Sequence, residues 1–241
     1  MPIITLTTDF GTSDGYVGAI KGVIAARAGE HATIVDIAHD VPRHDVAHAA
    51  WIVATACTRF PAATIHVVVV DPGVGGARRA VRVHALGMWF VGPDNGVFAY
   101  LPERRGHELA IPGAAAPTFH GRDVFAPAAA ELALGVIPAG ASIELAGAVP
   151  WGPRPAGEGR VVHVDHYGNL VTDLQRAEAG GTIAIAGRRL AIGRTYEDAA
   201  PGQLLAYIGS AGTIEIAVRD GRADRALDAP RGTRVVPVED R

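Results

Sequence analysis

The chain has 241 residues, of which 49% are hydrophobic, 20% charged and 6% aromatic. A chain of this length and composition buries a substantial core, which excludes a disordered protein and a small domain that depends on disulfides. The formal net charge is −3, so no global basic field attracts nucleic acid. Length alone permits one large domain or two modest ones.

Cysteine content and the lack of long apolar runs indicate the compartment. Cys57 is the only cysteine, so no internal disulfide can form, as expected in a reducing cytoplasm. The chain starts with a strand-like segment, IITLTT, rather than with a basic and then apolar leader. No apolar stretch approaches the ~20 residues that a membrane span needs. We therefore expect a soluble, cytoplasmic protein.

Up to about residue 136, strand-like and helix-like segments alternate. The run IHVVVV at 65–70 is apolar throughout, as in a strand buried on both faces of a parallel sheet. The other predicted strands are 3–8, 33–37, 79–85 and 88–92, and the predicted helices are 15–28, one from Pro42 to about Phe60, and 123–134. This alternation predicts an α/β fold class for residues 1–140, a three-layer α/β domain with a mostly parallel sheet.

The pattern changes near residue 137. Prolines and glycines concentrate at 141–157, which we interpret as a linker. Seven short strand-like runs follow between glycine-rich turns: RVVHVD, LVTDL, TIAIA, RLAIG, LLAYIG, TIEIAV and TRVVPV. No helix of convincing length interrupts them. Residues 158–241 are therefore predicted to form a smaller C-terminal β-barrel domain.

Polar residues follow several strands of the first domain, where open α/β sheets bind ligands. Asp9 ends the first strand, Asp71 follows the apolar run, Asp94 and Asn95 follow another strand, and His120 precedes the last helix. The segment DPGVGG at 71–76 resembles a phosphate cradle, but it lacks the Lys-Ser/Thr ending of a P-loop and a helix after it. A tight turn capped by Asp71 is the plainer alternative, and the glycines also permit close approach to a ligand.

Four histidine and aspartate side chains lie close together in the sequence, namely His39, His44, Asp45 and His48. On the predicted helix, His44 and His48 are four residues apart and would share one face. With Asp9 and Asp71 they could hold zinc or manganese, although no HExxH-type signature is present. Solvated histidines at a helix end are the ordinary interpretation.

The second domain has two polar segments. VDHYGNL contains Asp165, Tyr167 and Asn169, of which the amide could read an adenine edge and the ring could stack on a base. YIGSAGTIEIAV contains Tyr207, Ser210 and Glu215. No GxSxG elbow accompanies the serine, which argues against a serine hydrolase.

Six motifs in this order resemble the S-adenosyl-L-methionine hydroxide adenosyltransferase family, which is related to the fluorinase and chlorinase enzymes. They are TTDFGTSDGY, DPGVGGARR, GPDNG, FHGRD, VDHYGN and YIGSAGTIEIA, and the resemblance covers essentially the whole chain. It implies an N-terminal α/β domain, a C-terminal β-barrel and a homotrimer with active sites between subunits. It also implies hydrolysis of S-adenosyl-L-methionine (SAM) to adenosine and L-methionine.

The resemblance also implies a role for each matching residue. Asp71, Arg78 and His120 match the catalytic set of the hydrolase branch. Asp9 matches the aspartate that binds both ribose hydroxyls, Asp165 matches the residue that holds the methionine ammonium group, and Ser210 matches the contact with the methionine carboxylate. The implied substrate-binding set is Asp9, Asp14, Asp165, Tyr167, Asn169, Tyr196, Ser210 and Val218. Tyr167 replaces a phenylalanine, and Gly209 replaces a frequent asparagine.

The chemistry of SAM fits these residue types. A sulfonium leaves as a neutral thioether, so the reaction needs no general acid, metal or cofactor. The protein must hold water in line with C5′ of the ribose. Asp71 or His120 could accept the proton, whereas Arg78 would orient or stabilise hydroxide, because guanidinium keeps its proton.

Three other functions remain as alternatives. Halide-dependent adenosyl transfer occurs on the same fold. The resemblance implies, however, that halogenases lack the triad and carry an extra loop in the N-terminal domain, and nothing between Asn95 and His120 looks like that loop. A non-catalytic adenosine- or SAM-binding module would need Asp9 and Asn169 but no triad. A metal-dependent hydrolase would use His44 and His48.

Overall fold

The structure is a computed structural model that describes residues 1–147 and 154–238. It divides into two compact units, Met1–Pro150 and Trp151–Arg241, each described below by itself. Part of the predicted linker 141–157 belongs to the first unit, because Ser142 and Ile143 pair with another strand of its sheet. The stretch of that linker around Trp151 lies outside the described residues.

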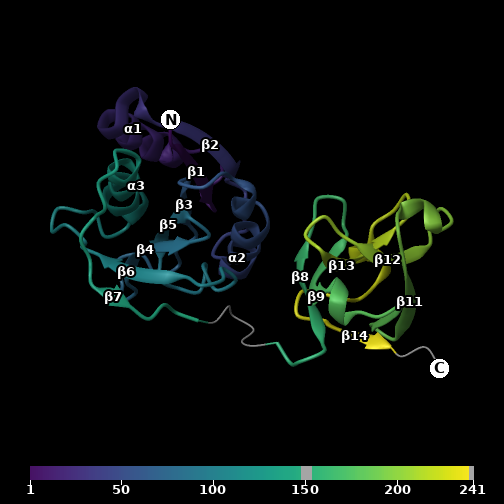
Figure 1. Cartoon of the computed structure of the whole chain (residues 1–241). Coiled ribbons are helices and arrows are strands. Elements are labelled where there is room, and N and C mark those ends of the chain that lie inside the picture. The colour runs from purple at the N-terminus through teal and green to yellow at the C-terminus, as the bar shows by residue number, and fades with distance from the viewer. Residues whose placement is uncertain (148–153, 239–241) are drawn as a thin grey trace. The chain divides into compact units, whose positions relative to one another are not determined.

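The first unit contains a sheet with the strand order β2-β1-β3-β5-β4-β6-β7 (Figure 1). Strands β2, β1, β3 and β5 run parallel, and β4, β6 and β7 extend the sheet in antiparallel pairs. In chain order the elements are β1 (Ile3–Thr8), α1 (Tyr16–Ala28), β2 (Thr33–Ala38), α2 (Val46–Thr55), β3 (Ile65–Val69), β4 (Ala80–Ala85), β5 (Met88–Pro93), β6 (Arg105–Leu109), α3 (Ala126–Ala133) and β7 (Ser142–Ile143).

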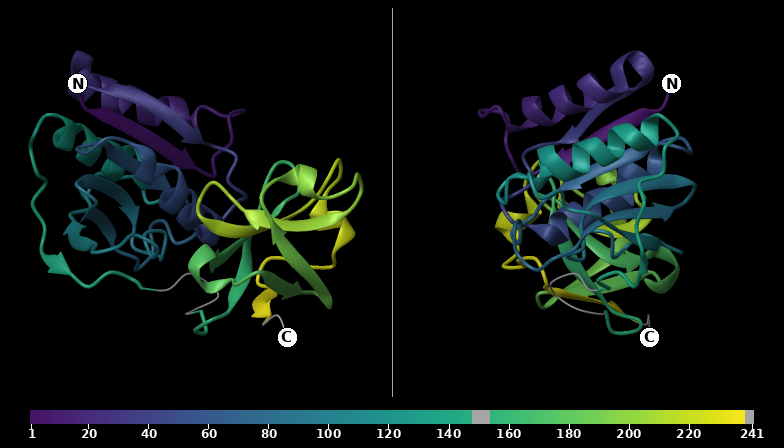
Figure 2. Two further views of the ribbon diagram at one scale, coloured as in Figure 1. Left: turned by 45° about the vertical axis from the view of Figure 1, so that its right-hand side comes forward. Right: turned by 90° about the vertical axis from the view of Figure 1, so that its left-hand side faces the viewer.

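Strand β3 belongs to the sheet, which is the middle layer between the helices α1 and α3 on one face and α2 on the other. Its side chains alternate, so that Val67 and Val69 join one apolar cluster with α1 and α3, and Val68 joins the other with α2. Helices α1 and α3 lie next to each other over the same face of the sheet (Figure 2). The continuous apolar run therefore has the cause that the sequence predicts: helices cover both faces of this strand.

The predicted start of the second helix is wrong. The helix α2 begins at Val46 rather than at Pro42, because Asp45 caps it: its side chain accepts a hydrogen bond from His48 N at 3.0 Å. His44 has a φ of 65°, a left-handed conformation that a helix cannot contain. The last helix also starts differently, with a π-helical turn at Gly121–Phe125 before α3. Strands β6 and β7 were not predicted.

The second unit is a closed barrel with the strand order β10-β11-β12-β13-β9-β8-β14, as predicted. Its strands are β8 (Gly159–Val164), β9 (Leu170–Gln175), β10 (Thr182–Ile185), β11 (Arg188–Gly193), β12 (Leu204–Ile208), β13 (Thr213–Val218) and β14 (Arg234–Val238). The helix α4 (Ala223–Ala226) is a single turn. All seven strand-like runs of the sequence become barrel strands, and each contributes at least one apolar side chain to the barrel's core cluster.

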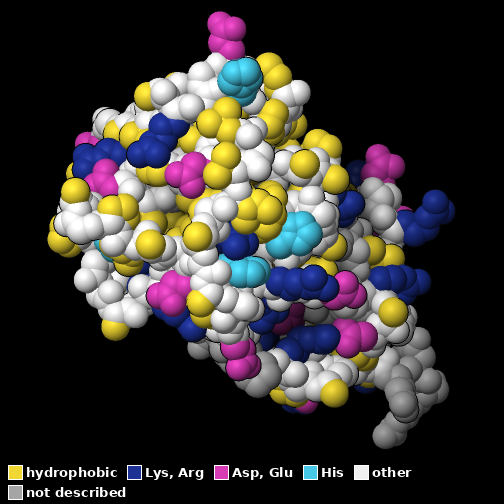
Figure 3. Space-filling view, turned by 60° about the vertical axis from the view of Figure 1, so that its left-hand side comes forward, with side chains coloured by type: hydrophobic (Ala, Val, Ile, Leu, Met, Phe, Trp, Pro, Cys, Tyr) yellow, Lys and Arg dark blue, Asp and Glu magenta, His cyan; other side chains and the backbone are white. Residues whose placement is uncertain are grey.

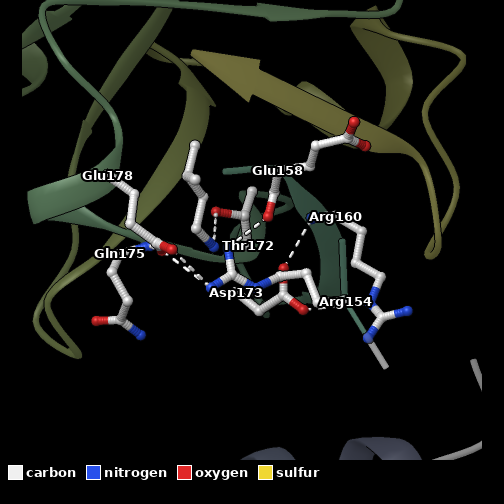
Figure 4. A network of polar contacts seen from close by, with 8 residues as sticks. Arg154, Glu158, Arg160, Thr172, Asp173, Gln175 and Glu178 are labelled. Atoms are coloured by element: carbon white, nitrogen blue, oxygen red, sulfur yellow. Dashed lines mark hydrogen bonds and ion pairs between the residues drawn. The ribbon is translucent and has the colours of Figure 1, made fainter. Parts of the chain in front are cut away.

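A polar network fastens the start of the barrel to β9 and to the helical turn Arg176–Glu178 that follows it (Figure 4). Arg160 donates from its backbone N–H and its guanidinium to Asp173, at 2.8 and 3.2 Å. Arg154 pairs with both carboxylate oxygens of Glu178, at 2.9 and 3.0 Å. These charge-assisted bonds fix the first barrel strand against its neighbour.

Charges of both signs adjoin one another on the face shown in Figure 3, rather than forming a field of one sign. That distribution agrees with the small net charge of −3. Among the helices of residues 1–147 and 154–238, none has the length and apolar character to cross a membrane.

His66 of β3 is a fully buried histidine in the core of the first unit. Its Nδ1 lies 2.7 Å from the Thr5 hydroxyl, and its ring stacks on Phe90 with centroids 4.7 Å apart. Burial lowers the pKa of His66 to about 4, so the imidazole is neutral in the folded protein at neutral pH.

We expect the protein to lose stability as pH falls from about 6.5 to 4. In this window the unfolded chain binds a proton at His66, whereas the native state does not, so stability is complete above the window and decreases within it. The shift corresponds to a loss on the order of 2–3 kcal/mol. Urea unfolding at several pH values should show this slope for the native sequence and a shallower one for His66→Phe. His31→Phe, at an exposed histidine, is the control and should keep the native slope.

Candidate functional site

Two parallel strands deliver aspartates to one edge of the first unit's sheet. Strands β1 and β3 pair in parallel with Thr8 opposite Val69, and their carboxyl ends lead to Asp9 and Asp71. Side chains that follow neighbouring parallel strands meet at the same edge. The sheet therefore places these two carboxylates on one side of the unit before any loop is considered.

Asp71, Arg78 and His120 are in direct contact. The Arg78 guanidinium donates from Nε to both oxygens of Asp71 at 3.0 Å and from Nη2 to Oδ2 at 2.5 Å. The same Nη2 donates to His120 Nδ1 at 2.7 Å. Three residues that are up to 49 positions apart thus form one hydrogen-bonded unit. Because both oxygens of Asp71 bind Arg78, its carboxylate serves this contact rather than the cap of a plain turn.

The contact is buried. The side chains of Arg78 and Asp71 are 9% and 5% exposed, and His120 is buried beside them. Burial, and then the nearby Arg78 cation, lower the pKa of His120, so its imidazole is neutral near pH 7. Within residues 1–147 and 154–238, the Arg78 Nη1 atom is buried and has no hydrogen-bond partner. A buried donor without a partner is costly, which makes Nη1 a candidate contact for a ligand or water.

The glycine-rich loop at 71–76 brings the side chains of Asp71, Arg78 and His120 together. Gly75 has a φ of 74°, and a Cβ there would overlap the backbone carbonyl of Pro117. The DPGVGG loop can therefore pack directly on the segment that carries His120 only because position 75 has no side chain. The glycines serve close approach between two loops, and the loop is followed by strand β4 rather than by the helix of a phosphate-binding loop.

A cavity of about 580 Å³ opens beside these residues in the first unit. Its lining includes Asp9, Asp14, Asp71 and His120, so four of the predicted residues share one cavity. Of the remaining lining residues, sequence reasoning named His44 only as a possible metal ligand, and it missed Phe10, Tyr16, Arg43, Val69, Val74, Thr118, Phe119 and Gly121.

Three of these missed residues form an aromatic cluster. The rings of Phe10, Tyr16 and Phe119 meet edge to face, with centroids 5.4 to 6.0 Å apart. Aromatic faces together with carboxylates suit an organic cation. Phe10 and Tyr16 belong to the motif TTDFGTSDGY at 7–16, whereas Phe119 lies more than 100 residues further along, and no sequence spacing relates it to them.

The hypothesis of a metal site on a helix face is wrong. His44 precedes α2, so it does not share a helix face with His48. Its backbone N–H instead donates to Asp9 Oδ2 at 2.8 Å, which holds one oxygen of that carboxylate. Among the described residues, no group of three or more His, Cys, Asp or Glu is arranged to hold a metal ion.

Asp94 and Asn95 have structural roles. Asp94 pairs with Arg79 and accepts from Ala146 N at 2.7 Å. The Asn95 amide donates to the Val70 carbonyl at 2.9 Å. They tie the ends of neighbouring strands together beside the cavity.

In the second unit, three predicted residues are connected. Asp165 accepts from Asn169 through its backbone N–H and its Nδ2, both at 2.8 Å. The same Nδ2 donates to the Tyr196 hydroxyl at 2.9 Å. The tight turn between β8 and β9 therefore presents an aspartate and an amide together.

The other three predicted barrel residues differ in how far a ligand can reach them. Tyr167 is 72% exposed, so its ring is available for stacking, and Ser210 is also exposed. The Val218 side chain is buried in the barrel core, so only its backbone could contact a ligand.

Comparisons with known proteins match both units. The family model of the SAM hydroxide adenosyltransferase N-terminal domain matches residues 4–141, and that of the C-terminal domain matches residues 159–236. The chain is 43% identical to (R)-S-adenosyl-L-methionine hydrolase of Thermus thermophilus, over 95% of this chain and 96% of that protein. It is 40% identical to the enzyme of the same name from Salinispora arenicola, over 97% of each.

More distant relatives and solved structures agree with this match. A fluorinase of Actinoplanes sp. is 27% identical over 73% of each protein. The crystal structure of a conserved hypothetical protein from Thermus thermophilus is similar with a TM-score of 0.85 and 39% identity, and the match covers 99% of this chain and 100% of that one.

We expect Gly75→Ala to destabilise the first unit more than a glycine substitution without close neighbours. Both Gly75 and Gly135 have a positive φ, but a Cβ at position 135 would meet nothing within 4 Å. Gly135→Ala should therefore cost only the backbone strain, about 1–2 kcal/mol. Gly75→Ala should cost about 1–3 kcal/mol more, because the loops must also separate. Equal losses in denaturant unfolding would contradict the packing argument.

Proposed function

The chain belongs to the SAM hydroxide adenosyltransferase family, and on this premise we propose that it is an enzyme that hydrolyses SAM to adenosine and L-methionine. The observation that carries the proposal is that Asp71 and His120 both line the cavity and are joined behind it by the buried Arg78 guanidinium. A module that only binds SAM or adenosine has no use for a buried charge pair of this kind. Identities of 40–43% with named SAM hydrolases over nearly the whole chain also support it.

In the proposed reaction, water attacks C5′ of the ribose and the sulfonium leaves as methionine. The positive charge of the substrate disappears as the thioether forms, so no acid has to protonate the leaving group. A cation and a hydroxide-like nucleophile lose charge together on the way to the transition state. A site that excludes water favours this step, because it stabilises the separated charges poorly.

The triad geometry supports a different part for each residue in the proposed reaction. A guanidinium can only donate, so His120 Nδ1 accepts from Arg78, and the neutral imidazole carries its proton on Nε2. Asp71 is then the group in the triad that can accept the proton from water. Arg78, which is not among the residues lining the cavity, would stabilise the developing hydroxide through its charge while it holds Asp71 in place. In this scheme His120 positions the guanidinium.

The proposed substrate contacts follow the family pattern. Asp9 has one oxygen held by the His44 N–H, which leaves the other to accept from ribose hydroxyls. Asp14 is the second acid of that wall. In the barrel, Asp165 would take the methionine ammonium group and Ser210 the carboxylate. The adenine side would consist of Tyr167, Asn169, Tyr196 and Val218.

We expect the purified protein to release adenosine and methionine in equal amounts from SAM, without halide and in the presence of a chelator, as measured by chromatography. His120→Ala and Asp71→Asn should each lower turnover by ~10²-fold or more, while SAM still binds, because Asp71 acts on water and His120 holds the guanidinium in place. His31→Ala, at an exposed histidine, is the control. Parallel losses of binding and turnover in the triad variants, measured by calorimetry and kinetics, would refute the assignment.

We further propose that the working enzyme is a cytoplasmic homotrimer in which each site combines the first unit of one subunit with the barrel of the next. The predicted residues divide between the two units, and contacts of this head-to-tail kind can close into a ring. The single cysteine, Cys57, is buried and free, which agrees with a reducing compartment.

Shared sites predict complementation between two inactive variants. His120→Ala damages only the first unit and Asn169→Ala only the barrel, so some interfaces of a mixed trimer pair two intact halves. Co-refolded variants should therefore release more adenosine than either variant alone. Native mass spectrometry verifies that mixed trimers form. Mixed trimers without regained activity would show that each chain holds its own complete site.

A further inference from the structure

One face of the first unit's sheet carries a group of basic side chains outside the cavity. Between β4 and β6, Arg82 is opposite His107 and His84 is opposite Arg105. Trp89 of β5 is opposite His84 on the other side. Opposite residues of antiparallel strands lie on the same face, with Cβ atoms about 4.5–5.5 Å apart, and so do residues two apart in one strand. These five side chains therefore form one cluster, which we call the basic face.

The basic face gathers cationic groups without a counter-ion. Each of its two opposite pairs joins an arginine to a histidine, an arrangement that costs free energy whenever the imidazole carries a proton. Within residues 1–147 and 154–238, no ion pair links any of these four side chains to a carboxylate. By contrast, Arg79, just before β4, pairs with Asp94. The sheet thus holds like charges together and provides nothing to neutralise them.

Arg82 is a buried guanidinium without an anion. Its side chain belongs to a residue that is only 6% exposed. Its Nε donates to the Pro138 carbonyl at 2.8 Å, and its guanidinium lies 5.5 Å from the centre of the Trp89 ring. Burial lowers the pKa of Arg82, whereas the bond to Asp123 raises the pKa of Arg122. A carbonyl and an aromatic ring do not compensate a buried charge as a carboxylate does.

The donor groups of the basic face remain available to a ligand. In the described part of the chain, the two Nη groups of Arg82 make no hydrogen bond and, unlike Nη1 of Arg78, are not enclosed. Arg105 is exposed, and His84 and His107 are half-buried. Burial, and then the Arg82 cation, lower the pKa of His107, so these two side chains lie close enough to repel each other. An anion between them would reverse that repulsion.

We propose that the basic face is a binding site for a phosphate group, either free phosphate or the phosphate of a monoester, with Arg82 and Arg105 as its principal contacts. Two guanidinium groups and two imidazoles offer more donors than the two oxygens of a carboxylate can use, whereas phosphate accepts on at least three oxygens. The planar fork of arginine also matches phosphate in a bidentate contact. None of the five residues lines the cavity beside Asp71 and His120, so this site is separate from the proposed reaction.

The test measures phosphate binding by calorimetry with the full-length protein. Inorganic phosphate and phenyl phosphate are the two probes, and chloride keeps the ionic strength constant so that non-specific attraction is screened equally. Trp89 is half-buried in the basic face, so the fluorescence of the protein should also change when phosphate binds. Trp89→Phe should remove this fluorescence change while calorimetry still detects binding.

Arg82→Met and Arg105→Met should each weaken phosphate binding about 10–100-fold, since each removes a charge-assisted contact. Methionine keeps a long apolar side chain in place of the arginine stem. Because Arg105 is exposed, its variant tests the site even if Arg82→Met does not fold. Arg43→Met is the matched control, at another exposed arginine of the first unit that lines the cavity instead, and it should keep the native affinity for phosphate.

Two results would support the proposal and also identify the ligand. Inorganic phosphate bound as tightly as phenyl phosphate indicates free phosphate, and tighter binding of phenyl phosphate indicates an aromatic monoester. No binding of either probe by the native protein, an unchanged affinity in folded Arg105→Met, or a loss of affinity in Arg43→Met would overturn the proposal. These outcomes do not depend on SAM hydrolysis, whose turnover Arg105→Met should leave unchanged.

Discussion

The Arg78 guanidinium is the contact on which the geometry of the first unit's site depends. It reaches Asp71 after β3 and His120 before α3, and so it ties two loops to the edge of one sheet. Burying a charge pair costs desolvation free energy, which the attraction between the charges offsets only when the geometry is good and additional hydrogen bonds are present. Here the bidentate bond and the contact with His120 supply that geometry, and the glycine at position 75 lets the loops come close enough to form it.

The two units place their polar groups according to different electrostatic needs. The first unit holds the buried ion pair of Arg78 and Asp71, in which Arg78 Nη1 has no partner among the described residues. A fixed charge pair of this kind suits a reaction in which the attacking water oxygen gains and then loses negative charge. The barrel holds hydroxyls and an amide in one ordered chain between two carboxylates. Such a chain moves no charge but fixes which atoms of the amide can meet a ligand, which suits recognition.

Much of the fold could be predicted because its causes are local. The apolar run of β3 and the seven alternating strands of the barrel each carry their own pattern, and the triad stands in recognisable motifs. Most of the errors lie where a tertiary contact decides. The start of α2 depends on the local Asp45 cap and also on the bond that holds the His44 N–H to Asp9, 35 residues earlier. The aromatic cluster of Phe10 and Phe119 joins segments more than 100 residues apart, and no single-sequence pattern reports such a meeting.

Gly209 shows how a local sequence difference can be misinterpreted without its neighbour. The resemblance implies a frequent asparagine at this position, so the glycine taken alone gives little support for that wall of the predicted pocket. In the folded barrel the space is filled by the Glu215 carboxylate, six residues further along the same hairpin, and that carboxylate holds Tyr207. A side chain at 209 would force the glutamate away and leave the tyrosine without its acceptor. The lack of a side chain at Gly209 is therefore what allows Glu215 to contact Tyr207.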